Sequence, residues 1–105
     1  MSVSIKTARE IELMRESCHL LEKVHDELAK AIRPGIVHGI PSKKRMLREG
    51  DIVSLDAGLI YKGYHSDAAR THAVGEISPE AQKLIDVTRQ SFFEGIKMAK
   101  AGNHL

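Results

Sequence analysis

The sequence predicts an α+β fold, in which two helices pack on one face of an antiparallel hairpin sheet. Two runs of apolar residues at spacings of three and four, each preceded by a helix-start signal, predict the helices. Between these runs, two strand-like arms joined by Tyr61-Lys62-Gly63 predict the hairpin. The expected order of elements is therefore helix, strand, strand, helix.

Length and composition fit one small domain, residues 1–105. The net charge of +2 is too small to indicate a polyanionic partner, so no specific DNA binding is expected. The single cysteine, Cys18, excludes an intramolecular disulfide and fits a reducing compartment. No apolar run approaches the ~20 residues of a membrane span, and the N-terminus lacks the apolar core of a secretory signal. We therefore expect a cytoplasmic protein with no membrane partner.

The first helix begins at Thr7-Ala8-Arg9-Glu10, which matches a capping box, and ends before Pro34-Gly35. Its expected apolar stripe is Ile11, Met14, Cys18, Leu21, Val24, Leu28 and Ile32. Cys18 lies on this stripe, so we interpret it as a core residue rather than a nucleophile. We expect His19 and His25 at the surface or at the edge of the stripe.

The connection from Ile36 to Arg48 has the composition of a loop and carries a basic cluster. The cluster consists of Lys43, Lys44, Arg45 and Arg48. Such a run can bind nucleic acid, but a solvated loop is the simpler interpretation because no aromatic residues lie among the charges. Glu49-Gly50-Asp51 predicts a turn into the hairpin.

The first arm of the hairpin, Ile52–Ala57, is apolar and partly β-branched, which favours a mostly buried strand. The second arm, Tyr64–Val74, is mixed, and Gly63 can take the positive φ of a tight turn. Asp56 and Asp67 lie about equally far from a turn centred on Tyr61-Lys62-Gly63. In that register their side chains face each other directly, with Cβ atoms roughly 4.5–5.5 Å apart.

Two carboxylates that close repel each other unless one holds a proton or a cation lies between them. Burying Asp56 in its apolar arm without a partner would be costly, which favours a metal pair. The alternative is two solvated aspartates, and a one-residue bulge would change the register. His65 and His72 flank Asp67, either as outer groups of such a site or as exposed strand residues.

Ser78-Pro79-Glu80 predicts the start of the second helix, with Ser78 as N-cap and Pro79 at the first helical position. Its apolar face is Ala81, Leu84, Ile85, Thr88, Phe92, Ile96 and Ala99. Ala101-Gly102-Asn103 is the expected stop.

The segment Val37 to Gly75, VHGIPSKKRMLREGDIVSLDAGLIYKGYHSDAARTHAVG, resembles the central part of type I methionine aminopeptidases, metallopeptidases of the pita-bread (creatinase/aminopeptidase-like) fold. The HGIP, DIVSLDAG and GYHSDAART blocks occur in the family's order, and the flanking helices are also similar. The resemblance implies one partial aminopeptidase-like domain over residues 1–105, half of the pita-bread fold.

The resemblance also implies a site. Asp56 and Asp67 correspond to two ligands of a dinuclear metal centre, and His38 to a histidine that contacts the substrate; no catalytic residue beyond the metal site is expected. The family uses two divalent ions per site, of Co, Mn, Fe or Zn, to hydrolyse the first peptide bond and remove the N-terminal methionine from nascent proteins. Hard oxygen ligands suit such ions.

Two parts of the family pattern have no counterpart here: a few dozen residues between Ile36 and Val37, and the second half, which supplies the remaining ligands. The chain alone is therefore expected to be weakly active or inactive. Exposed sheet edges and apolar surface predict self-association or marginal stability.

Two alternatives stay open from the residues. One is a non-enzymatic binding module on the same half-fold, which would contact the ribosome or its RNA through the basic loop Lys43–Arg48. The other is a relative that cleaves before proline, which the HGIP and SKKR blocks resemble less closely.

Overall fold

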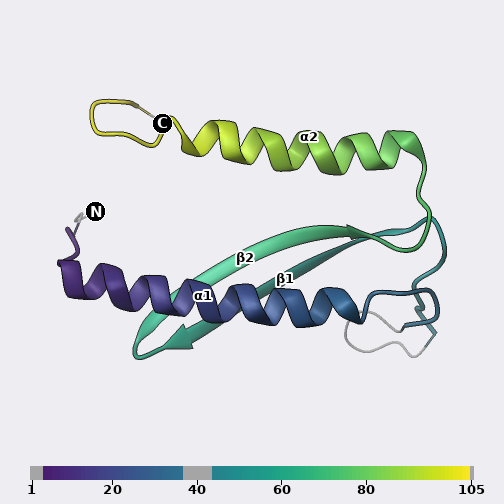
Figure 1. Ribbon diagram of the computed structural model, residues 1–105, viewed down its shortest axis with the longest axis horizontal. Coiled ribbons are helices and arrows are strands. Elements are labelled where there is room, and N and C mark those ends of the chain that lie inside the picture. The colour runs from purple at the N-terminus through teal and green to yellow at the C-terminus, as the bar shows by residue number, and fades with distance from the viewer. Residues whose placement is uncertain (1–3, 37–43, 105) are drawn as a thin grey trace. The chain divides into compact units, whose positions relative to one another are not determined.

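The computed structural model describes residues 4–36 and 44–104, which form the four expected elements in the expected order (Figure 1). They are α1 (Ala8–Lys30), β1 (Ile52–Tyr61), β2 (Tyr64–Ala73) and α2 (Pro79–Ile96). Two compact units divide the chain: residues 1–32 with 53–72, and residues 33–52 with 73–105. The first unit contains α1 and nearly all of the hairpin; the second contains α2 and the segments that lead into and out of the hairpin.

The capping box at the start of α1 is confirmed. Glu10 N–H donates to Thr7 Oγ1 at 3.3 Å, and Thr7 N–H donates to Glu10 Oε2 at 2.7 Å. This backbone hydrogen bond from Thr7 is the main reason that the pKa of Glu10 lies below its ordinary value. The Tyr64 hydroxyl also donates to Glu10 Oε1 at 3.3 Å, so the cap is tied to the start of β2.

A two-residue turn, Lys62-Gly63, joins the strands. Both residues have positive φ, 49° at Lys62 and 83° at Gly63, as a type I′ hairpin turn requires. The predicted positive φ of Gly63 is confirmed, whereas Lys62 adopts a conformation that is unusual for a residue with a side chain.

The register follows from this turn and from one cross-strand contact. Tyr61 and Tyr64 flank the turn, and Ser54 Oγ lies 2.9 Å from Thr71 Oγ1 on the opposite strand. Along β1, half-buried and exposed residues alternate without exception. The predicted mostly buried first strand is therefore wrong: one face of the hairpin packs and the other is open, as is usual for an antiparallel sheet.

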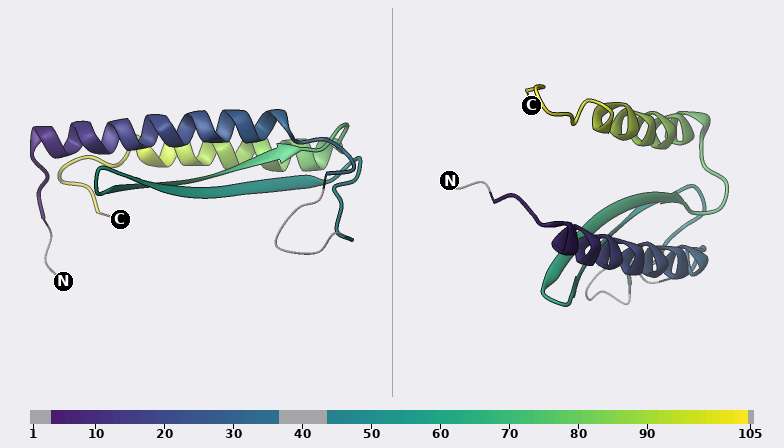
Figure 2. Two further views of the ribbon diagram at one scale, coloured as in Figure 1. Left: turned by 90° about the horizontal axis from the view of Figure 1, so that it is seen from below. Right: turned by 60° about the vertical axis from the view of Figure 1, so that its left-hand side comes forward.

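Helix α1 lies along one face of the hairpin (Figure 1, Figure 2). Its buried residues, Ser17, Leu21 and His25, recur every four positions, so the line of contact lies to one side of the expected apolar stripe. The prediction that Cys18 is a core residue is wrong because Cys18 is exposed. Of the two positions expected for His25, the surface is wrong, since only 1% of the residue is accessible, and the edge of the stripe agrees with its place on the buried line.

Two polar groups on this line are buried because each finds a partner on β2. Ser17 Oγ lies 2.9 Å from Ser66 Oγ, and Ser66 Oγ donates to the Ser17 carbonyl at 3.1 Å. His25 Nε2 lies 2.8 Å from the Ala68 carbonyl oxygen, which can only accept, so Nε2 carries the proton. We call Ser17, His25, Ser66 and the Ala68 carbonyl the polar seam.

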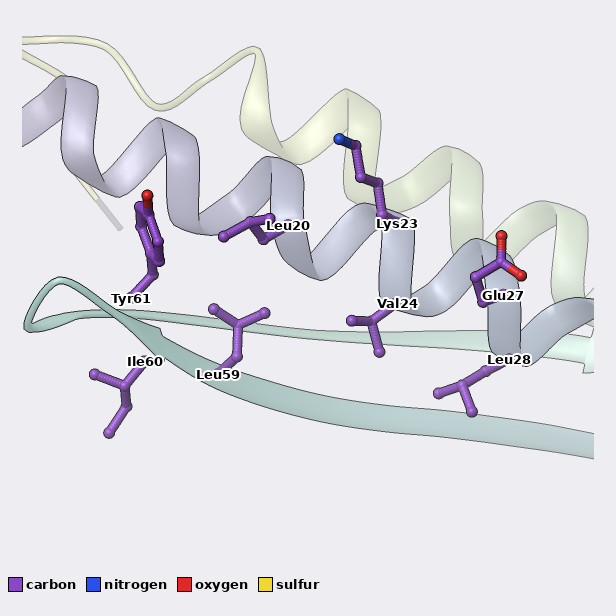
Figure 3. Close-up of a pocket in the computed structure, with 8 residues that line it drawn as sticks. All are labelled: Leu20, Lys23, Val24, Glu27, Leu28, Leu59, Ile60 and Tyr61. Carbon is purple, nitrogen blue, oxygen red and sulfur yellow. The ribbon is translucent and has the colours of Figure 1, made fainter.

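Beside the seam, an open apolar groove of about 580 Å³ separates α1 from β1. In Figure 3, Val24 of α1 and Leu59 of β1 reach toward each other, whereas Ile60 points to the opposite side of the strand. Part of the expected α1 stripe lies along this groove, including Val24 and Leu28, each 42% exposed.

The second unit is built around Leu47 and Val74, both buried. Val74 N–H donates to the Asp51 carbonyl at 2.9 Å, and Gly50 N–H donates to the Val74 carbonyl at 3.0 Å, which extends the strand pairing past the hairpin. Ser78 caps α2 as predicted, its hydroxyl accepting from the Ala81 amide at 3.1 Å, with a proline in the first turn. Neither helix among the described residues has the length and apolar character needed to cross a membrane.

Replacing Gly63 with alanine is expected to destabilise the protein by about 1 kcal/mol, because a side chain at positive φ meets the backbone. The same substitution at Gly95, inside α2 with open space around it, is expected to stabilise by roughly 0.5–1 kcal/mol. Urea unfolding measures the change in the free energy of unfolding for each variant. A change of the same sign and size in both variants would contradict the assigned turn.

Candidate metal centre

The open face of the hairpin carries the predicted site. Because side chains alternate along a strand, the residues that point away from α1 are the even-numbered ones of β1 and the odd-numbered ones of β2. The polar members of this face are Ser54, Asp56, His65, Asp67 and Thr71. The open face is therefore rich in oxygen ligands.

Asp56 and Asp67 share this face, but they are not directly opposite each other as predicted. The two-residue turn pairs Asp56 with Ala69 and Asp67 with Gly58, so the two aspartates are diagonal neighbours. The predicted register was wrong: direct pairing of Asp56 with Asp67 requires a turn centred between Tyr61 and Lys62, whereas the observed turn is centred one position later, between Lys62 and Gly63. Diagonal neighbours lie roughly 7–8 Å apart, a spacing that leaves room for ions between the carboxylates.

Gly58 gives the Asp67 carboxylate the space that it occupies. A Cβ atom at Gly58 would lie 3.2 Å from Asp67 Oδ2 and 3.3 Å from the Ser66 carbonyl oxygen. The carboxylate therefore lies across the glycine, where any side chain would push against it. This glycine and the two carboxylates fit a metal-binding role.

Both carboxylates are exposed, so the burial cost that was expected to force a metal between them does not arise. Among the described residues, no group of three or more His, Cys, Asp or Glu side chains is placed to hold a metal ion. The open face thus provides two oxygen-donor residues, which is part of a ligand set.

The three histidines near the site in sequence have different positions. His38 lies outside the described residues. His65 is exposed on the open face, two positions from Asp67. His72 is half-buried on the α1 side, so it does not flank the metal face as its sequence position had allowed.

Two buried imidazoles on the α1 side were not predicted from the sequence. His25 Nδ1 and His72 Nε2 are buried and have no hydrogen-bond partner among the described residues. Burial lowers the pKa of His72 below its ordinary value, and the charges of Arg70 and His25 add to this effect. No periodic apolar pattern marks His25, because two of the three buried residues of α1, Ser17 and His25, are polar.

A family model described as metallopeptidase family M24 matches residues 35–105, more than half of the chain. The chain belongs to metallopeptidase family M24. Methionine aminopeptidase of Clostridium acetobutylicum is 56% identical over 78 residues, covering 74% of this chain and 31% of that protein. Methionine aminopeptidase 1 of Bacillus subtilis is 34% identical over 140 residues, covering 95% of this chain and 56% of that protein.

The crystal structure of methionine aminopeptidase from Rickettsia prowazekii has the same fold, with a TM-score of 0.84 and 22% sequence identity. The match covers 90% of this chain and 54% of that one, which confirms the predicted half of the pita-bread fold. The chain therefore spans about half the length of the Rickettsia and Bacillus proteins and about a third of the length of the Clostridium protein.

The Bacillus alignment also confirms the internal shortening. The alignment is 140 positions long, but it contains only about 100 residues of this chain, 95% of 105. About 40 positions of the Bacillus protein therefore have no counterpart in this M24 chain.

Lowering the pH below about 6.5, the ordinary pKa of histidine, is expected to destabilise the protein. The folded state holds His72 at a lowered pKa, so the unfolded state binds more protons and the free energy of unfolding falls as the pH falls. Urea midpoints at pH 7.5 and 5.5 measure the effect. It should shrink in His72→Gln and persist in His19→Gln, since His19 is exposed. An equal drop in His72→Gln would contradict this assignment.

Proposed function

We propose that the chain is part of a metal-dependent aminopeptidase that removes the N-terminal methionine from nascent proteins. The observation that carries the proposal is the placement of Asp56 and Asp67 on one open face, with Gly58 making room for the Asp67 carboxylate. The names of the similar proteins, all methionine aminopeptidases, supply the substrate.

In this proposal Asp56 and Asp67 are direct ligands of two divalent ions, of Co, Mn, Fe or Zn. Bound ions would polarise the scissile carbonyl and lower the pKa of water at the site. The two aspartates contribute negative charge and hard oxygen donors, which divalent ions of this group accept. Their attachment to paired strands rather than loops keeps the two carboxylates at a fixed separation.

Two carboxylates are a small ligand set for two ions. We therefore propose that the 105-residue chain binds metal weakly and releases methionine slowly or not at all. His38 remains the predicted substrate contact, and a cytoplasmic location, contact with the ribosome and self-association also remain predictions. No contact of the described loop residues 44–48 favours the alternative role in RNA binding.

Replacing either aspartate with asparagine is expected to weaken Mn²⁺ binding by at least about tenfold. Mutating a residue that only hydrogen-bonds to a metal ligand already lowers metal affinity by roughly 10–100-fold, and a direct ligand should matter at least as much. Calorimetric titration of the wild-type chain, Asp56→Asn and Asp67→Asn measures this directly. Asp86→Asn on α2 is the matched control, because it removes an exposed carboxylate far along the sequence from the site.

A parallel assay follows release of methionine from a Met-Ala-Ser peptide with added Mn²⁺ or Co²⁺. Release that both aspartate variants abolish would support an active chain. Absent release with weak metal binding would limit the proposal to a metal-binding half-site. Unchanged Mn²⁺ affinity in both variants would overturn the role of the two aspartates.

A further inference from the structure

The two ends of the polar seam contact β2 on either side of Asp67. Ser17 of α1 is hydrogen-bonded with Ser66, the residue before Asp67, and His25 binds the carbonyl of Ala68, the residue after it. Both contacts are buried, with His25 at 1% and Ser66 at 6% accessibility. Asp67 thus lies between two residues of β2 that are hydrogen-bonded to α1 side chains; Tyr64 and Arg70, further along the strand, also bond to α1 side chains.

These two contacts determine the face of the hairpin to which the Asp67 side chain points. Because successive side chains point to opposite faces, holding Ser66 toward α1 directs Asp67 to the open face. A slip of β2 by one residue would reverse this and turn Asp67 toward α1. The seam contacts would be lost in the same slip, so they oppose it.

Apolar packing alone would resist such a slip less strongly. Leu21 is the one buried apolar residue of α1, and apolar contact is not directional. The edges of this hairpin are unpaired among the described residues, since its sheet has only two strands, and an isolated hairpin is marginally stable. Hydrogen bonds with discrete geometry therefore supply the specificity that two strands lack.

We infer that Ser17 and His25 are positioning residues for the metal site: they hold β2 in the register that presents Asp67 beside Gly58. This inference rests on the proposed role of Asp67 as a metal ligand. Helix α1 has no side chain on the open face, yet by this inference it determines the geometry of that face.

Two variants weaken the seam at one end each. Ser17→Ala removes the hydroxyl that contacts Ser66 and the Tyr64 carbonyl, and leaves the bond from Ser66 Oγ to the Ser17 carbonyl. His25→Leu removes the imidazole N–H while retaining an apolar side chain. Rescue variants restore the donors: Ser17→Thr keeps the hydroxyl, and the amide of His25→Gln can donate to the Ala68 carbonyl. Leu21→Ala is the control, because it weakens the same helix contact without removing a hydrogen bond.

The first measurement needs no metal. Amide hydrogen exchange of residues 66–68 is compared with that of residues 54–56 in each variant. Ser17→Ala and His25→Leu are expected to accelerate exchange at residues 66–68 selectively, whereas Leu21→Ala should accelerate both segments together. Uniform acceleration in the seam variants would overturn the inference, whatever the outcome for metal binding.

The second measurement is Mn²⁺ affinity alongside the urea midpoint. We expect the seam variants to lose about tenfold in affinity, with recovery in Ser17→Thr and His25→Gln. Leu21→Ala should lower the midpoint at least as much while changing the affinity of the folded chain less than twofold. If affinity simply follows the urea midpoint across all variants, the seam is structural only. Unchanged affinity in Asp67→Asn would instead overturn the proposed ligand, leaving hydrogen exchange to decide the positioning role.

Discussion

The structure of the first unit depends on keeping a two-stranded hairpin in one register. Two strands form few hydrogen bonds, and residues 4–36 and 44–104 contain no third strand that would fix their register. Helix α1 provides the constraint through buried polar contacts to β2 rather than through a wide apolar contact. Buried hydrogen bonds add little net stability, but they penalise every arrangement in which they are broken.

This constraint divides the hairpin into two faces with different chemistry. The α1 face contains serines and a histidine that are hydrogen-bonded within the protein, and the lowered pKa of His72 makes stability depend on pH. The open face carries the exposed aspartates that define the candidate metal centre. Successive side chains of β2 point to opposite faces, so the residues that pack against α1 determine which residues lie on the open face.

Sequence signals with a local cause were predicted correctly. The capping box at Thr7, the N-cap at Ser78 and the positive φ of Gly63 each depend on residues a few positions apart. The shared face of Asp56 and Asp67 was also predictable, because it needs only an even offset between the strands. Their diagonal placement was not, since moving the turn centre by one position moves the partner of Asp56 by two residues along β2, and Lys62 gives no sign that it adopts positive φ. Nor does hydrophobic periodicity identify His25, whose burial depends on the Ala68 carbonyl, 43 positions away.

Gly58 of β1 affects the position of a side chain on β2. Its backbone does not lie at positive φ, so the main chain itself would accept any residue there. A side chain there would be tight against Asp67 Oδ2 at 3.2 Å and against the Ser66 carbonyl oxygen at 3.3 Å, so these neighbours would have to give way by a few tenths of an ångström. The absence of a side chain on one strand thus sets where a carboxylate on the other strand can lie.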